Sequence, residues 1–557
     1  MRTVIGLCLA LLLAVPPLKA GEIEDLGRDF WNWRSVTQPF TYDDIPRIER
    51  PRGWQADWSA AAIAKRRQDL ATFEQRWKKI PVQSDRSKEV DRRLLGSAIM
   101  RVHWEMDVLR RQERDPHFYN EQTLGALAEG LLPPPPFTPE RSQEIVRRLE
   151  SFPRILEDAR HNLTAPVAPF ARISIAELAQ VRSQLQAMDR ELKPLLAPES
   201  AARMDAATEQ AIRALESYSG WLQERLARMP EKAEIGRDNY VWFLKNVALL
   251  PFTPEEMLEI GRHEWARSVA FEEYERHRNR DVPELKLLAS QADQIKREAA
   301  DEIAVRRALH ERGILDVPET VQHYRYLAIP AYLAPLTGFS EGDDLTSVSR
   351  LGENGSRYIP QPSPDLSYFA RAAAKDPRLA IAHEGVHYMQ LAWSWSHEDP
   401  IRRHYYDSGA NEGLAFYNEE MVTQAGLFDD SPHTREIIYN MARLRALRVE
   451  VDIKLATGQF SIAQGAEYLK TMVPMDEPTA RAEAAFFATN PGQAITYQIG
   501  KTQILEFLAE ARRKEGDRFD LARFHDFVWK NGNVPIALQK FEYLGTGKDL
   551  DKVEHLH

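Results

Sequence analysis

Residues 383–387 read His-Glu-Gly-Val-His, so two histidines stand four positions apart and a glutamate directly follows the first. On a helix, residues four apart lie on the same face. Both imidazoles could then bind one metal ion, with Glu384 beside them as a proton carrier. The pattern predicts a zinc-dependent peptide hydrolase in which His383 and His387 hold Zn²⁺ and Glu384 is the general base.

A catalytic zinc site needs a third protein ligand and leaves one position for water. Glu412 lies near the start of a second predicted helix, which begins at Ser408 and ends near Gly426. Two helices joined by a short ordered loop can pack antiparallel, so we expect Glu412 to be the third ligand. The alternative is that Glu412 only stabilises the start of its own helix. Glu419, two turns further on the same face, is expected to hold a ligand imidazole through a hydrogen bond.

The motif needs a helix to position it. Asp376 and Pro377 are typical of a helix start, and Pro400 must follow the helix end. We therefore expect one continuous helix from this start through Trp395, with both histidines in its interior.

Composition describes a soluble globular chain. Of 557 residues, 43% are hydrophobic and 28% are charged, which excludes a disordered protein. The formal net charge of -10 gives no sign of a basic surface, so no nucleic-acid partner is expected. The one cysteine, Cys8, lies in the first twenty residues. Any metal held by the rest of the chain must therefore be bound by His, Asp and Glu.

Residues 1–20 have the layout of a secretory signal peptide, with Arg2, an apolar run over 4–15 and a small residue at Ala20. The alternative is a buried N-terminal helix. The run is too short to span a bilayer, so no stable membrane span is expected after cleavage. We expect an exported protein, periplasmic or secreted. A mature chain without cysteine suits an oxidising compartment.

The remaining sequence reads as helices separated by turns that contain proline. Thr138 and Thr253 each precede Pro-Glu and are predicted N-caps, and 132–136 is predicted to be extended. Strand signals are weak and strongest at 355–369. The predicted fold class is mainly α, a large helical metallopeptidase-like fold with a deep central cleft and little β structure. Residues 21–557 are expected to form a single domain, with an N-terminal helical half (about 21–340) and a metal-site half (about 341–557).

Three blocks carry a resemblance to a known family: 383–390 (HEGVHYMQ), 412–419 (EGLAFYNE) and 491–500 (PGQAITYQIG), the last followed by Phe519-Asp520 and 524–526. The chain resembles the bacterial domain of unknown function 885 family, a helical group similar to zinc metallopeptidases of the gluzincin type. The likeness extends over most of the mature chain. The family often has Pro-Gly before the second histidine, and this chain lacks it, which leaves the substrate preference open. The ligand spacing is also similar to that of helical oligopeptidases, which implies short peptides as substrates.

The resemblance also implies helper residues. Such peptidases stabilise the oxyanion with a Tyr or His, a role we assign to Tyr497, expected two turns into a helix that opens at Asn490-Pro491. An ordinary core tyrosine is the alternative. Arg357, Tyr358 and His404 flank the metal helices and are candidate substrate-binding residues, with Arg357 suited to a peptide carboxylate.

Two other functions stay open. One is a metallohydrolase that acts on another amide or an ester, and the other is a helical binding protein that keeps a vestigial metal site. The intact Glu384 argues against the vestigial site, because a structural metal needs no base beside it. The sequence leaves open the substrate, the end of the peptide attacked and the oligomeric state.

Overall fold

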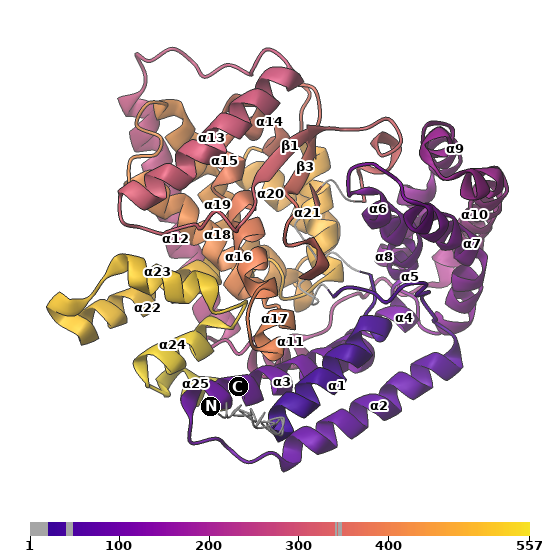
Figure 1. The fold of residues 1–557 in the computed structure, drawn as a ribbon, viewed down its shortest axis with the longest axis horizontal. Coiled ribbons are helices and arrows are strands. Elements are labelled where there is room, and N and C mark those ends of the chain that lie inside the picture. Colours follow the sequence, from indigo (N-terminus) through magenta and orange to yellow (C-terminus); the bar gives the residue numbers. More distant parts are fainter. Residues whose placement is uncertain (1–20, 41–47, 340–341, 344–347) are drawn as a thin grey trace, which may run out of the picture.

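The computed structural model describes residues 21–40, 48–339, 342–343 and 348–557 (Figure 1). The described part contains 25 α-helices and one sheet of three short strands. The expected fold class, mainly α with little β structure, is confirmed. The predicted signal peptide and Cys8 lie outside the described residues. No described helix combines the length and the apolar character needed to cross a bilayer.

The first thirteen helices precede the sheet. They are α1 (Glu22–Thr37), α2 (Ala60–Lys79), α3 (Arg86–His103), α4 (Arg111–Arg114), α5 (Pro116–Asn120), α6 (Ala126–Leu131), α7 (Pro139–Asn162), α8 (Ala168–Leu178), α9 (Val181–Leu192), α10 (Pro198–Arg225), α11 (Arg237–Asn246), α12 (Pro254–Arg278) and α13 (Gln291–Glu311).

The strands and the helices of the motif region follow. They are β1 (Tyr324–Ala328), β2 (Gly342–Asp343), β3 (Gly355–Ile359), α14 (Tyr368–Lys375), α15 (Arg378–Ile381), α16 (Glu384–Trp395), α17 (Pro400–His404), α18 (Ser408–Gln424), α19 (Pro432–Ala456), α20 (Ile462–Met472), α21 (Glu477–Thr489), α22 (Thr496–Glu515), α23 (Leu521–Lys530), α24 (Ile536–Leu544) and α25 (Lys548–Glu554).

Local sequence explains several of these boundaries. Thr138 caps α7 and Thr253 caps α12, each by accepting a hydrogen bond from a backbone N–H three residues on, as predicted. At α12 the side chain of Glu256 also accepts from the backbone N–H of Thr253, which completes a capping box. The proline run at 132–136 contains no helix, also as predicted.

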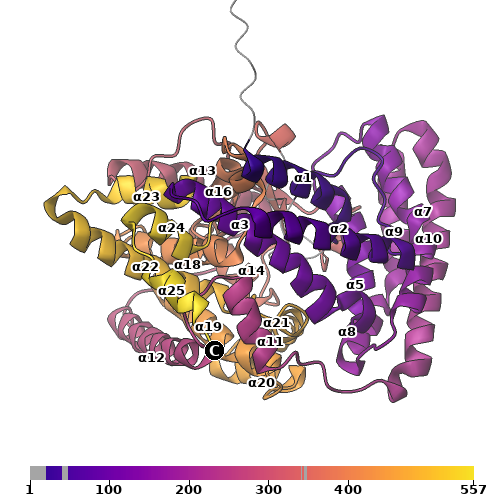
Figure 2. The same ribbon diagram turned by 90° about the horizontal axis from the view of Figure 1, so that it is seen from below.

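The buried apolar side chains of the described residues form four clusters, and the two with the most members mark two groups of helices. In one group α7 lies along α10, and Figures 1 and 2 show this pair at the edge of the molecule farthest from α22 and α23. The other core surrounds α16, α18, α22 and α23. Two helices that precede residue 340 belong with this second group, since α12 packs on α19 and α13 packs on β1 and α15.

One strand of the sheet, β3, lies in the region where strand signals were strongest, whereas β1 and β2 precede that region. Its order is β1-β3-β2, with β1 and β3 parallel and β2 antiparallel to β3. In this register Tyr326 of β1 is paired with Arg357 of β3. Because β3 is the central strand, the backbone of Arg357 is held between β1 and β2. Arg357 precedes the motif helix in the sequence.

Candidate metal centre

The motif helix is interrupted at the first residue of the metal motif. The prediction of one helix from Asp376-Pro377 through Trp395 is wrong: α15 ends at Ile381, α16 begins at Glu384, and His383 stands between them with φ -111° and ψ -71°. The reason is a tertiary contact. The carbonyl of Ala382 accepts a hydrogen bond of 2.8 Å from the side chain of Asn418 in α18, and Val386 N–H turns to the carbonyl of His383 instead.

The break does not separate the two histidines. The backbone N–H of His387 still donates to the carbonyl of His383, and the ring centroids are 4.8 Å apart. Nε2 of His383 lies 3.2 Å from Oε2 of Glu412, and Nε2 of His387 lies 3.1 Å from the same oxygen. One ligand atom from each of these residues lies within 4.8 Å of the others. The structure thus brings together all three predicted ligands.

Glu419 lies where a supporting carboxylate was expected. Its Oε1 is 2.7 Å from Nδ1 of His383 and 2.7 Å from Nη2 of Arg445. A proton on Nδ1 would be donated to Glu419, which leaves the lone pair of His383 on Nε2, facing Glu412. With the proton on Nδ1, His383 is in the tautomer that binds a metal; Nη2 of Arg445 also lies 3.3 Å from this nitrogen.

The charges of the centre favour a cation. Burial and Arg445 lower the pKa of His383, but the carboxylates of Glu412 and Glu419 outweigh them and raise it to about 9. Burial opposes the charge of Glu412, yet the two histidines hold its pKa well below the usual range. Oε2 of Glu412 is buried and accepts no hydrogen bond of ordinary geometry from the described residues. Two imidazole nitrogens converging on such an oxygen fit the donor set of a catalytic zinc site.

Tyr497 reaches the centre on α22. Its hydroxyl donates a hydrogen bond of 2.9 Å to Oε1 of Glu412, and its ring lies nearly parallel to that of His383. The prediction of a helix from Asn490-Pro491 is wrong, because α22 begins only at Thr496. Asp452 accepts hydrogen bonds from the backbone N–H groups of Gly492 and Ala494, and this holds the segment in a turn. Tyr497 is consequently in the first turn of its helix.

The close packing of α18 and α22 brings Tyr497 near Glu412. α18 and α22 touch at Gly413 and Gly500, where a Cβ on Gly413 would lie 2.5 Å from the Cα of Gly500. Only glycines allow these backbones to come so near. Glu412 is adjacent to one glycine and Tyr497 is one turn before the other, so the contact sets the distance between the two side chains.

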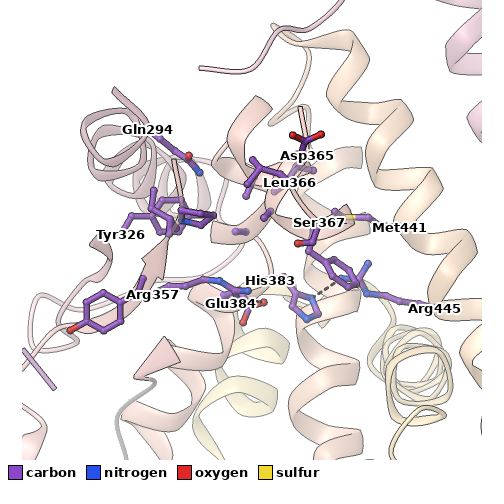
Figure 3. A pocket seen from close by; sticks show the side chains of 18 residues that line it. Gln294, Tyr326, Arg357, Asp365, Leu366, Ser367, His383, Glu384, Met441 and Arg445 are labelled. Carbon is purple, nitrogen blue, oxygen red and sulfur yellow. Dashed lines mark hydrogen bonds and ion pairs between the residues drawn. The ribbon is translucent and has the colours of Figure 1, made fainter. Parts of the chain in front are cut away.

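Glu384 projects between two cavities. One, of about 170 Å³, is lined by the three candidate ligands together with Glu384, Tyr497 and Leu391. The other, of about 240 Å³, is shown in Figure 3 and shares His383 and Glu384 with the first. Arg357 lines the second cavity, and its Nη1 lies 2.8 Å from Oε1 of Glu384. Burial opposes the charge of Glu384, but Arg357 and the histidines lower its pKa, so the carboxylate is ionised.

The other predicted substrate residues differ in position. Tyr358 points to the N-terminal group, since its hydroxyl donates to the carbonyl of Leu132 and its ring is in that core. His404 lines neither cavity and lies between the rings of Trp31 and Trp395, where burial lowers its pKa to about 4. Tyr358 is nevertheless among the residues that line the 240 Å³ cavity beside Glu384, whereas His404 has no contact with either cavity.

Two arginines of α19 belong to the site and were not foreseen. Arg445 holds Glu419, and the guanidinium of Arg448 lies 4.3 Å from the centre of the Tyr497 ring while it binds Glu483 through two bonds of 2.7 Å. Both are buried. The sequence does carry one indication of them, because Arg445 and Arg448 are charged residues on an otherwise apolar helix face. Charged side chains that are buried are expected to be paired with opposite charges.

Comparisons with known proteins agree with this fold. The model of the family described as "Bacterial protein of unknown function (DUF885)" matches residues 49–320 and 352–540. A "putative lipoprotein" from Colwellia psychrerythraea has a TM-score of 0.73 and 15% identity, covering 96% of this chain and 99% of that one. A "putative lipoprotein of unknown function" from Shewanella oneidensis has a TM-score of 0.70 and 14% identity, covering 94% and 100%. No functionally curated protein matches the chain.

Proposed function

The chain belongs to the DUF885 family of bacterial proteins of unknown function, and we propose that this member is an exported zinc-dependent hydrolase of peptide bonds. The observation that carries the proposal is the convergence of His383, His387 and Glu412, with the carboxylate of Glu384 in the same cavity. Two histidines of this spacing plus a glutamate on a later helix is the gluzincin-like arrangement. Support for export comes from the signal-like residues 1–20 and from structural neighbours described as lipoproteins.

His383, His387 and Glu412 would hold the zinc ion, and Glu419 would keep His383 in the binding tautomer. Zinc in such a site lowers the pKa of a water molecule and polarises a carbonyl group. Glu384 takes the proton of the attacking water and passes it to the leaving amine nitrogen. Arg357 keeps Glu384 ionised in the resting protein.

In this proposal Tyr497 donates a hydrogen bond to the oxyanion of the tetrahedral intermediate. Burial and Glu412 raise its pKa well above the ordinary value, so the phenol keeps its proton. Its hydroxyl already points into the ligand cluster, at 2.9 Å from Glu412. A small rotation about the side-chain bonds would turn that hydrogen bond from the carboxylate to the substrate.

Digestion of a mixed synthetic peptide pool, with cleavage sites mapped by mass spectrometry, tests the proposal. Zinc-loaded protein is expected to cleave peptides, and Glu384→Gln is expected to bind zinc but to lose cleavage by at least about a thousandfold. Glu273→Gln is the matched control, because Glu273 is an exposed glutamate of α12 far from the ligands in sequence. If Glu384→Gln cleaves as well as the parent protein, the mechanism is wrong. If no peptide is cleaved, the proposal of a peptide hydrolase is wrong. The alternatives are then a hydrolase of a non-peptide amide or an ester, and a binding protein.

A further inference from the structure

The 240 Å³ cavity shown in Figure 3 is lined mainly by apolar groups, whereas the cavity of the candidate ligands is mainly polar. Ala370 and Ala373 lie one turn apart on α14 and line the cavity together with Ala380 of α15. These three alanines are only partly buried, and the buried side chains of Leu379 and Met441 extend the apolar surface. The short alanine side chains leave a volume that a larger apolar group would fill.

The arginines of this cavity are already engaged within the protein. Arg357 lies 2.8 Å from Glu384, and Arg445 lies 2.7 Å from Glu419. Asp365 is exposed, and Figure 3 shows it across the cavity from Glu384. A charged side chain that entered the cavity would lose its hydration, and an exposed carboxylate offsets little of that cost. An apolar side chain has no such cost, so the cavity suits an apolar group best.

The position of Glu384 determines which part of a peptide reaches this cavity. The scissile carbonyl group must approach the candidate ligands and Tyr497, which line the other cavity. Glu384 lines both cavities, and its carboxylate must come within about 3 Å of the scissile nitrogen to deliver a proton. The nitrogen, and the residue that owns it, therefore lie on the side of the apolar cavity.

Covalent geometry then brings the side chain of that residue to the alanines. Its Cβ atom lies two bonds from the scissile nitrogen, about 2.5 Å away. The main chain of the same residue continues with a carbonyl group, which needs a hydrogen-bond donor when it is buried. Because the lining is mainly apolar, the cavity favours the side chain over the main chain.

We propose that this cavity receives the side chain of the residue directly after the scissile bond and selects large aliphatic side chains such as leucine, with Ala370 and Ala373 as specificity-determining residues. This inference rests on the proposed function and names its substrate class. Water adds to the scissile carbonyl carbon, and the C–N bond breaks. The acyl part leaves as a carboxylate, and both protons of the water end on the new amino group, the first of them delivered by Glu384.

Matched substrates test the preference. A peptide that the parent protein cleaves is remade with leucine, asparagine or alanine directly after the cleaved bond and is otherwise unchanged. Asparagine matches leucine in shape but is polar, and alanine is apolar but small. The kcat/KM for the leucine peptide is expected to exceed each of the others by about tenfold or more. Equal values for the three peptides, or a preference confined to the residue before the bond, would overturn this inference while the peptide hydrolase stands.

Filling the cavity tests the role of the alanines. Ala373→Leu is expected to lower the ratio of kcat/KM for the leucine peptide over the alanine peptide by about tenfold. Ala370→Leu, on the same face of α14, is expected to change the ratio in the same direction. A ratio measured within one variant is insensitive to partial loss of folded protein. Ala300→Leu is the matched control, since Ala300 is an exposed alanine of α13 that does not line the cavity. An unchanged ratio in both cavity variants would show that the side chain after the bond does not occupy this cavity.

A binding measurement separates this inference from the proposed function. Leucyl-glycinamide and alanyl-glycinamide each carry the amino terminus that cleavage would create. Calorimetry is expected to show about tenfold or more tighter binding of the leucyl compound to the parent protein, and loss of this difference in Ala373→Leu. If no peptide is cleaved but this difference is found, the cavity is supported and the hydrolase fails. Equal binding of the two compounds to the parent protein would overturn the assignment of the cavity.

Discussion

Gly413→Ala tests whether the contact between α18 and α22 sets the geometry of the metal centre. The added Cβ would lie 2.5 Å from the Cα of Gly500 and 2.7 Å from its carbonyl carbon. Carbon atoms in ordinary contact are about 3.5–4.0 Å apart, so the two helices must separate by about 1 Å. Both obstructing atoms are backbone atoms, and no side chain can rotate away to make room.

Two effects on stability partly offset each other. Overpacking of this kind costs about 1–3 kcal/mol. Alanine has a better helix propensity than glycine by about 1 kcal/mol, so the expected net loss of stability is at most about 2 kcal/mol. The effect on activity is larger. A shift of about 1 Å between Tyr497 and Glu412, now 2.9 Å apart at their oxygens, is expected to lower kcat/KM about a hundredfold.

The assay is denaturant unfolding of metal-free protein, together with kcat/KM on a peptide that the parent protein cleaves. Gly465→Ala is the matched control, because Gly465 is also a buried helical glycine, but its Cβ would meet its nearest neighbour at 3.5 Å. That variant is expected to keep its activity and to be at least as stable as the parent. If Gly413→Ala behaves in the same way, the close approach of the helices does not determine the site.

Three further changes have distinct expected outcomes. Tyr497→Phe removes the hydroxyl that faces Glu412 and is expected to lower kcat about 10²–10³-fold while one zinc per chain is retained; an unchanged kcat would make Tyr497 a core residue only. Glu419→Gln takes a carboxylate from His383 and Arg445, so a competition titration with a chelator is expected to show zinc affinity lower by about 10–100-fold, and equal affinity would contradict its supporting role. Removal of zinc is expected to lower the thermal unfolding midpoint, since zinc at a hundred times its Kd stabilises the fold by about 2.7 kcal/mol; a midpoint independent of zinc would contradict the site.

The cluster of His383, His387 and Glu412 could be predicted because its main constraint is local. His383 and His387 are separated by one turn, and that spacing survives even though α16 begins between them. Glu412 and Glu419 follow from the same periodicity on one well-capped helix. The fold class was equally accessible, since long apolar-periodic segments and threonine caps mark helices without reference to the rest of the chain.

The helix predictions were wrong where backbone groups form hydrogen bonds with side chains that are distant in the sequence. Asn418 donates to the carbonyl of Ala382, and the first predicted helix is interrupted there. Asp452 accepts from the N–H groups of Gly492 and Ala494, and the second predicted helix begins later than expected. No local sequence pattern predicts such contacts. The same holds for His404, whose neighbour Trp31 comes from the first described helix. These positions depend on contacts between residues that are far apart in the sequence, and sequence periodicity does not predict such contacts.

Zinc titration of metal-free protein tests the central claim most directly. Isothermal calorimetry is expected to show one site per chain in the parent protein, with binding lost in the double variant His383→Ala/His387→Ala. The double variant must keep the helical circular dichroism of the parent for the comparison to count. Absence of stoichiometric zinc binding in the parent protein, or unchanged binding in the folded double variant, would contradict the metal centre and the hydrolase built on it.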